Sequence, residues 1–465
     1  MKANNQTRLI RFMFAALLIM MTVLAGCSSS DGNTKKNESA PVQTNAEEKG
    51  TEKETNEDAG MAVKDKTAIQ GDLKVLTPWG TGFTEQFKNL IADFNKEYPK
   101  IKVTYMDQTT ADLATLIAGG EAPDLISALG LAPDLTKNDM IEDLTPYIET
   151  DGEVKPELFY DFAYKRSLSP EGQVWALPWH VEPAFIMMYN PEILEHNGYT
   201  EVPEFDSLQS YGDFLRQFWI VENGEQVMTT YLPHEVYGPM NSLTTIAYFN
   251  GADAASFYNP ADNKVTFNDP KIVEALEWIV RFKRENIDDN RLSRLQSSLP
   301  ENTDRFLAGK SALQPEIALH LRNYHKLNPD IKAIPMPPES IYIGGWSFAL
   351  TKAGKKENKE AAWELLKWMT STQAGAESQQ KHFGWLSGIK NNPYFEEETK
   401  RDPISKAAYD VLQSATKLQP FMPVDYEPEF NAKWAEVMSG ELEPKAFLDH
   451  MTVYTQKLID EQYKP

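Results

Sequence analysis

Runs of apolar and polar residues near the start of the folded chain predict a strand, a helix and a second strand. Residues 72–77 and residues 101–106 each have the composition of a strand. Between them, residues 83–98 carry apolar side chains at helical spacing on one face, namely Phe87, Leu90, Ile91 and Phe94. Strand, helix and strand in succession indicate an α/β fold. Ligands of such folds bind at the carboxyl ends of the strands, and Trp79 lies at such an end.

A second pattern further along predicts that the chain crosses from one packed body to another. Pro178 stops a short extended segment, a polar break follows at residues 179–183, and residues 184–188 are apolar at every position. A continuous apolar run suits a strand that is buried on both faces. The polar break places Trp179 and Glu182 between the two bodies, where a ligand cleft would form.

Three such crossings are predicted. Proline- or glycine-marked segments separate α/β blocks near residues 178–183, 334–338 and 385–389. The chain after the N-terminal segments is too long for one hydrophobic core, so two lobes are expected. These lobes would comprise residues 71–180 with 336–388, and residues 181–335 with 389–465.

The N-terminal residues read as an export signal that ends at a lipid attachment site. Basic residues precede an apolar run at residues 12–25, which is shorter than the roughly 20 residues of a membrane-spanning helix. Leu24-Ala25-Gly26-Cys27 resembles the bacterial lipobox, so residues 1–27 would be a lipoprotein signal peptide and Cys27 would carry the lipid. Cys27 is the only cysteine, which leaves the protein without a disulfide. Residues 28–70 lack aromatic side chains and are expected to form a disordered tether.

Charge and motif content exclude several classes of function. The 68 acidic and 46 basic residues give a formal net charge of −22 at pH 7. Nucleic acids and anionic membranes require clustered Lys and Arg, so such partners are disfavoured. The seven histidines show no metal-ligand spacing, and no nucleophile elbow, zinc-protease helix or phosphate-binding loop is present. We therefore expect a monomer without cofactor or metal.

Several short motifs occur in one order along residues 70–465 and resemble those of the family 1 extracellular solute-binding proteins, the maltose-binding-protein-like group. Residues 176–198 resemble the crossover between the lobes of that family. Residues 304–313 resemble its Phe-x-x-Gly-Lys-x-Ala-Met pattern, and residues 342–352 resemble its Gly-Gly-Trp strand. The resemblance implies a two-lobed, periplasmic-binding-protein-like α/β fold with a hinge of three crossover segments and the ligand cleft between the lobes. It also implies that the bound solute passes to an ABC-type permease.

The cleft should be lined by aromatic and polar residues next to these motifs. Trp346 follows Gly345 at the start of an apolar strand, so its indole can form a wall while the backbone approaches a ligand. Tyr237 and Asn241 lie at the start of a predicted helix, and Glu316 follows a predicted buried strand. The predicted ligand-binding residues are Trp79, Gly80, Trp179, Glu182, Tyr237, Asn241, Glu316, Gly345, Trp346 and Trp385.

This combination indicates a neutral sugar or oligosaccharide, because tryptophan rings stack on sugar faces while carboxylates and amides bind hydroxyls. We expect a protein that is lipid-anchored on the extracellular face of the cell membrane and delivers this ligand to an ABC-type permease. A surface sugar sensor or adhesion protein on the same fold is the main alternative. A secreted glycoside hydrolase would need two carboxylates about 5–9 Å apart, and nothing in the spacing selects such a pair.

Overall fold

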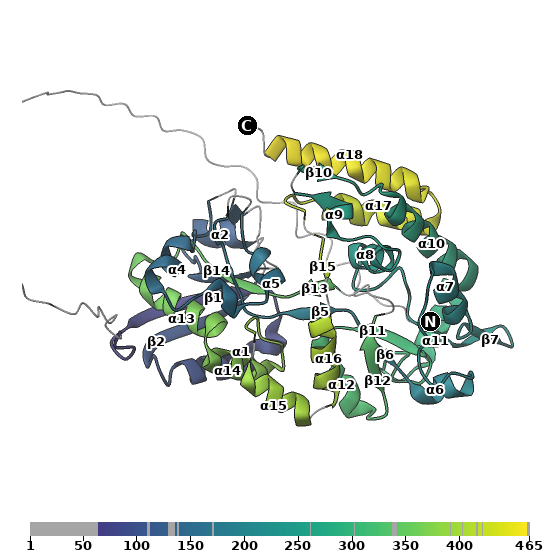
Figure 1. Ribbon diagram of the computed structural model, residues 1–465, viewed down its shortest axis with the longest axis horizontal. Helices are drawn as coiled ribbons and strands as arrows, with labels where there is room; N and C mark the ends of the chain where they lie inside the picture. Colours follow the sequence, from purple (N-terminus) through teal and green to yellow (C-terminus); the bar gives the residue numbers. More distant parts are fainter. Residues whose placement is uncertain are drawn as a thin grey trace, which may run out of the picture. The chain divides into compact units, whose positions relative to one another are not determined.

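The computed structural model in Figure 1 describes most of the chain after the N-terminal segments. The described residues are 64–108, 112–128, 135–136, 139–169, 172–260, 262–301, 303–336, 342–390, 392–401, 403–414, 417–420 and 422–462. The predicted signal peptide, Cys27 and residues 28–63 of the predicted tether lie outside these ranges. Among the described helices, none is both long enough and apolar enough to cross a membrane.

The first sheet confirms the predicted strand, helix and strand. Its five strands have the order β2 (Lys100–Asp107), β1 (Gln70–Thr77), β3 (Leu125–Ala128), β14 (Ser347–Leu350) and β4 (Leu177–Pro178). Strand β1 is parallel to β2 and β3, whereas β14 is antiparallel to β3 and β4. Helix α1 (Thr84–Phe94) ends earlier than residue 98, because the Asn95 amide donates to the carbonyls of Tyr98 and Ile101 at 3.0 and 2.7 Å and holds a turn there.

The second sheet is built on the apolar run after the first crossing. Strand β6 (Ile186–Tyr189) is buried along its whole length, as predicted, and lies between β11 (Leu313–Glu316) and β12 (Lys332–Pro335). Both neighbours are antiparallel to β6, and Glu316 and Pro335 pair with Ile186 at the end nearest the crossing. The chain therefore enters this sheet at the edge where β11 and β12 finish.

Helices cover both sheets. Between β2 and β4 the chain forms α2 (Leu113–Ala118), α4 (Thr145–Asp151) and α5 (Asp161–Lys165), and after β14 it forms α13 (Lys359–Ser371) and α14 (Gln373–Phe383). Short 3-10 turns lie at Thr81–Phe83, Pro156–Leu158 and Lys356–Asn358. The others are α6 (Pro191–His196), α7 (Leu208–Arg216), α8 (Pro239–Phe249), α9 (Ala254–Phe257), α10 (Pro270–Asn286), α11 (Asp289–Ser298), α12 (Ala318–Leu327), α15 (Pro393–Arg401), α16 (Pro403–Ser414), α17 (Glu427–Ser439) and α18 (Pro444–Gln462). The described residues also form two hairpins, β7 (Ile220–Glu222) with β8 (Glu225–Met228), and β9 (Tyr258–Asn259) with β10 (Lys264–Val265).

Each of the two larger sheets has its own hydrophobic core. One core gathers side chains from β1, β14, α1 and α13, among them Leu73 and Phe348. The other gathers side chains from β6, α8, α10 and α17, among them Met188 and Leu276. Full burial of one such side chain contributes about 1.5–3 kcal/mol, so each core can stabilise its own body. The protein is two-lobed, as the sequence predicted.

A small third sheet joins the lobes. It contains β5 (Glu182–Ala184), β13 (Tyr342–Gly344) and β15 (Lys417–Leu418), with β13 antiparallel to β5. The third crossing lies beside the first, since Val181 N–H donates to the Leu386 carbonyl and Gly388 N–H donates to the Trp179 carbonyl, both at 3.0 Å. Three crossing segments therefore form the junction.

The second crossing was predicted near residues 334–338, where β12 ends. Ile334 and Pro335 are the last pairs of β12 in the second sheet, opposite Met187 and Ile186, and the end of the predicted segment lies outside the described residues. The chain changes sheets between β13 and β14, through Gly345. The residues at the end of β12 still pair with β6. At Gly345 the backbones of two crossings come close together, and only glycine permits that approach.

Ordered contacts begin before residue 70, where the predicted tether ends. Lys64 Nζ lies 3.2 Å from the Glu360 carboxylate, and Lys66 Nζ lies 2.6 Å from the Glu97 carboxylate. These pairs fasten the segment before β1 to α13 and to the turn after α1. The partners of both lysines lie far away in the sequence, so the composition of the segment alone does not reveal these pairs.

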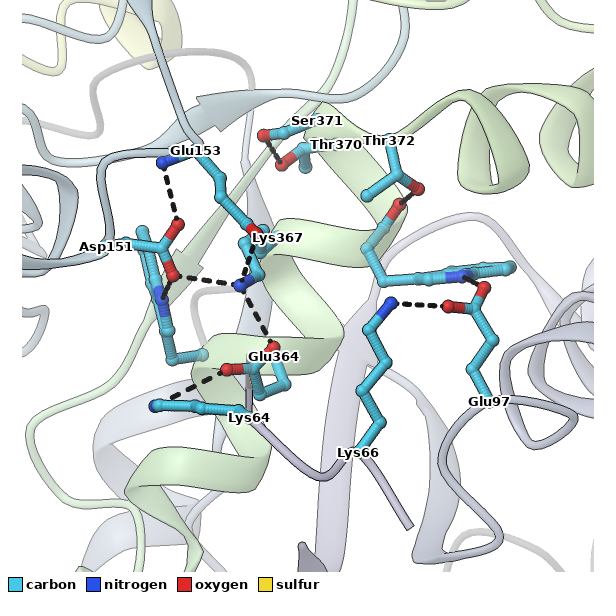
Figure 2. A network of polar contacts seen from close by, with 12 residues as sticks. Lys64, Lys66, Glu97, Asp151, Glu153, Glu364, Lys367, Thr370, Ser371 and Thr372 are labelled. Atoms are coloured by element: carbon cyan, nitrogen blue, oxygen red, sulfur yellow. Dashed lines mark hydrogen bonds and ion pairs between the residues drawn. The ribbon is translucent and has the colours of Figure 1, made fainter. Parts of the chain in front are cut away.

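Beneath this segment lies a buried ionic network (Figure 2). Lys367 Nζ is 2.9 Å from Asp151 and from Glu153, and 3.1 Å from Glu364. Asp151 and Glu364 are almost fully buried, so their charges depend on Lys367 for compensation. Lys64 adds a second positive charge 3.7 Å from Glu364.

Candidate functional site

Three tryptophans gather beyond the edge of the first sheet where β1 and β4 end. The rings of Trp79 and Trp179 are stacked, with centroids 4.9 Å apart and planes 11° apart. The Trp385 ring, from the third crossing, packs against both at 5.2 and 5.3 Å. Trp179 is 1% exposed and Trp385 is 3% exposed, whereas Trp79 is only half-buried. Trp179 and Trp385 were predicted to contact the ligand, and the structure places both rings in the buried part of this group, packed against Trp79.

Trp346, from the second crossing, joins Trp79, Trp179 and Trp385, and we call these four residues the aromatic wall. Its ring meets Trp79 edge to face at a centroid distance of 6.3 Å and remains partly exposed. The Trp346 carbonyl accepts hydrogen bonds from the N–H groups of Trp179 and His180, both at 3.0 Å. Gly345 has a φ of 133°, and a Cβ on it would lie 2.0 Å from the His180 carbonyl oxygen. Glycine is therefore required where the two crossings touch, and that contact positions Trp346.

Gly80 has a comparable supporting role for Trp79. Its φ of 87° and ψ of 159° are essentially restricted to glycine. Its N–H donates to the Asp107 carboxylate at 2.8 Å, and its carbonyl accepts from the Tyr105 hydroxyl at 3.3 Å. The chain after β1 is thus tied to the end of β2, and Trp79 is held at the edge of the sheet.

The corresponding edge of the second sheet carries a polar cluster. Tyr237 precedes α8, Glu316 ends β11, and His320 lies in the first turn of α12. The Tyr237 hydroxyl donates to the Glu316 carboxylate. Nδ1 of His320 is 2.9 Å from that carboxylate and 3.1 Å from the Tyr237 hydroxyl oxygen. Glu316 is 5% exposed while Tyr237 is 42% exposed, so the cluster has a buried anion beneath an accessible ring.

The Glu316 carboxylate raises the pKa of both groups that contact it. The hydrogen bond to Glu316 raises the pKa of His320 above its usual value. Burial, with the negative charge of Glu316, raises the pKa of Tyr237 and keeps its hydroxyl protonated. The Phe185 ring stacks on Tyr237 with centroids 5.0 Å apart and fixes its plane.

Asn241 supports Tyr237 from the first turn of α8. Its side-chain amide donates to the Tyr237 carbonyl at 2.8 Å. Tyr237 has a φ of 49°, in the left-handed region that a non-glycine residue rarely adopts. The hydrogen bond from Asn241 therefore helps to hold a strained backbone in place. Asn241 was predicted to contact the ligand, and that contact stays a prediction beside the hydrogen bond to Tyr237.

Glu182 lies in the junction between the aromatic wall and the polar cluster. His180 Nε2 is 3.6 Å from the Glu182 carboxylate, and the His180 ring packs on Trp385 at 4.7 Å. Burial lowers the pKa of His180 to about 3, so this imidazole is neutral. The charge of Glu182 contributes to the raised pKa values of Tyr237 and His320. The predicted residues therefore form two groups that meet at Glu182.

His320 is a member of the site that sequence reasoning missed. Its four-residue spacing from Glu316 suits a contact within one helix, but Glu316 ends a strand and α12 begins only at Ala318. We did not predict a helix at residues 318–327 from the sequence. The contact depends on how α12 leaves β11, which the local sequence does not reveal.

The arrangement suits binding of a ligand with both apolar faces and hydroxyl groups. Ring surfaces pack against C–H faces, the carboxylates accept hydrogen bonds, and the imidazole and the Tyr237 hydroxyl add further hydrogen-bonding groups. Within the described ranges, no group of three or more His, Cys, Asp or Glu side chains could hold a metal ion.

Comparisons with known proteins agree with this architecture. The family model of the bacterial extracellular solute-binding proteins matches residues 89–406. The maltotriose-binding protein of Pyrococcus abyssi is 23% identical over 380 residues, which cover 76% of this chain and 73% of that protein. An ABC substrate-binding protein of Listeria monocytogenes, solved with cycloalternan, has a TM-score of 0.68 at 20% identity and covers 83% of this chain and 98% of its own. The GacH receptor of Streptomyces glaucescens, solved without ligand and with acarbose, has a TM-score of 0.66 at 17% identity and covers 84% of this chain and 99% of its own.

The structural likenesses show a shared two-lobed fold, and the family match covers more than half of the chain. A solute-binding protein, and not a glycoside hydrolase, is the class that this match supports. The chain therefore belongs to the bacterial extracellular solute-binding protein family.

Proposed function

We propose that the protein captures a neutral sugar or oligosaccharide outside the cell and delivers it to an ABC-type permease. The observation that carries this proposal is the pairing of two accessible tryptophans, Trp79 and Trp346, with the cluster of Tyr237, Glu316 and His320 across the junction. Indole rings match the C–H faces of a sugar, and the cluster matches its hydroxyls. The relatives compared above are named for, or were solved with, maltotriose, cycloalternan and acarbose, which supports a carbohydrate ligand.

Binding would close the two lobes around the sugar. The aromatic wall and the polar cluster belong to different lobes and lie next to the three crossings, so a rotation about the crossings would change their separation. Closure would exclude water and strengthen the hydrogen bonds to the ligand. The permease would then recognise the closed form.

A thermal-shift panel tests the ligand class. The panel contains neutral mono-, di- and trisaccharides, with uronic acids and free amino acids as matched non-cognate solutes. A cognate sugar at 100 times its dissociation constant should stabilise the protein by about 2.7 kcal/mol and should be recovered unchanged. Stabilisation by amino acids with no response to any sugar would contradict the proposal.

The proposed membrane attachment depends on Cys27. The Leu24-Ala25-Gly26-Cys27 pattern supports lipidation at this position, which would hold the protein on the extracellular face of the cell membrane. Cys27→Ala should appear in the medium or retain its signal peptide. A variant that still fractionates as a lipid-modified membrane protein would refute the anchor.

A further inference from the structure

Two neighbouring glutamines near the end of α14 are buried beneath the aromatic wall. Gln379 is 0% exposed and Gln380 is 2% exposed. The Gln379 amide nitrogen donates to the Trp179 carbonyl at 2.9 Å. The Gln380 amide, in the orientation that gives its nitrogen an acceptor and its oxygen a donor, donates to the Trp385 carbonyl at 2.6 Å. A buried amide is costly unless it is hydrogen-bonded, and here each amide holds the backbone of one buried tryptophan.

Arg322 of α12 holds this end of α14 from the second lobe. Its Nη2 donates to the Gln380 side-chain oxygen at 2.9 Å. Its Nε and Nη2 also donate to the Ser405 hydroxyl of α16, at 2.9 and 2.7 Å, which fixes the plane of the guanidinium. A Cβ on Gly384, the C-cap of α14, would lie 2.9 Å from Nη1, so glycine leaves room for the cation there. A positive charge at the C-terminus of a helix is stabilised by the helix dipole.

Helix α12 also carries His320, a member of the polar cluster. His320 and Arg322 are two positions apart, and such positions project from nearly opposite sides of an α-helix. One side of α12 therefore contacts Glu316 and Tyr237, and the other contacts the end of α14. A single helix thus connects the polar cluster to the aromatic wall.

We propose that Arg322 is a positioning residue, which acts through Gln380 to set where the aromatic wall stands relative to the polar cluster. Its effect on affinity rests on the proposed sugar-binding function, whereas its effect on the wall does not. Without the hydrogen bond from Arg322 to Gln380, the third crossing would shift and the Trp385 ring would move with it. The two halves of the site would then match a bound sugar less well.

Near-ultraviolet circular dichroism of the unliganded full chain tests the positioning directly. The stacked rings of Trp79 and Trp179, with Trp385 packed on both, give an indole signal that depends on their relative geometry. Arg322→Met removes the guanidinium but keeps an unbranched side chain, so the indole signal of the folded variant should change. Gln380→Leu breaks the same contact, should change the signal in the same way, and serves as the test if Arg322→Met does not fold.

Titration with the sugar that gives the largest shift in the thermal panel tests the consequence for binding. Arg322→Met and Gln380→Leu should each weaken binding by about 2- to 30-fold, which is the range for residues that modulate a site without contacting its ligand. Because both variants break the same contact, the double variant should bind about as tightly as the weaker single variant. Arg294→Met removes an exposed arginine that pairs with Glu225, and it should change neither the affinity nor the indole signal.

A purely structural role for Arg322 would give a different result. The urea midpoint of Arg322→Met would fall, but the indole signal and the affinity of the folded variant would equal those of the wild type, and this outcome would overturn the inference. Additive losses of affinity in the double variant would overturn it as well, because Arg322 and Gln380 would then act separately. A wild type that binds no sugar of the panel would overturn the proposed function, while the indole signal would still test Arg322.

Discussion

Gly345→Ala should damage the junction severely, because three separate costs coincide at this position. The new Cβ would lie 2.0 Å from the His180 carbonyl oxygen and 2.9 Å from the Val181 Cα, both of them backbone atoms that cannot rotate away. Overpacking of this kind costs about 1–3 kcal/mol. The crossings would have to separate, which weakens two hydrogen bonds to the Trp346 carbonyl, each worth about 0.5–1.5 kcal/mol. The positive φ adds about 1 kcal/mol for a non-glycine residue.

Together these effects predict a loss of about 3–7 kcal/mol in the free energy of unfolding. Urea denaturation followed by tryptophan fluorescence measures that loss. Gly440→Ala is the matched control, since Gly440 also has a positive φ of 82° but has open space around its Cβ position, so only about 1 kcal/mol should be lost. Equal losses in the two variants would mean that the crossings do not touch at Gly345, and the account of how Trp346 is positioned would be wrong.

Two other perturbations test the electrostatics. Lys367→Met should lower the free energy of unfolding by about 3–5 kcal/mol, because it leaves Asp151 and Glu364 buried without their main cation. The control Lys406→Met removes an exposed lysine and should lower it by less than about 0.5 kcal/mol. Equal urea midpoints for the two variants would contradict this prediction. Because the pKa of His320 is raised, its stabilising contribution is complete below about pH 6.5 and is lost as the pH rises through the folded pKa. The difference in urea midpoint between wild type and His320→Gln should therefore shrink as the pH rises, and a constant difference would refute the assignment.

The features predicted well from the sequence are those that depend on local patterns. The apolar run that forms β6 identified a buried central strand, because a strand buried on both faces has no polar positions. The helical spacing of four apolar residues identified α1 and its buried face, and these residues are Phe87, Leu90, Ile91 and Phe94. The glycines before Trp346 were expected to let the backbone approach a ligand, and the close approach in the structure is between Gly345 and the His180 backbone.

The features predicted poorly depend on how distant segments meet. Residue type alone did not distinguish Trp179, which the stacked Trp79 covers, from Trp346, which remains partly exposed. The cluster around Glu316 needed the direction in which α12 leaves β11, and His320 was therefore missed. Such contacts are set by the packing of whole elements, and a pattern read along one segment does not contain them.

The central claim is that Trp346 is a wall of the sugar site, and titration of Trp346→Ala with the best sugar from the panel tests it most directly. Loss of an aromatic anchor should weaken binding by about 30- to 1000-fold, or 2–4 kcal/mol. The thermal midpoint should change little, since this side chain is partly exposed and lies outside the buried cores. Trp179→Ala, the buried counterpart, should instead lower stability by about 3–5 kcal/mol. A Trp346→Ala variant with nearly intact affinity and a strongly lowered melting temperature would contradict the account.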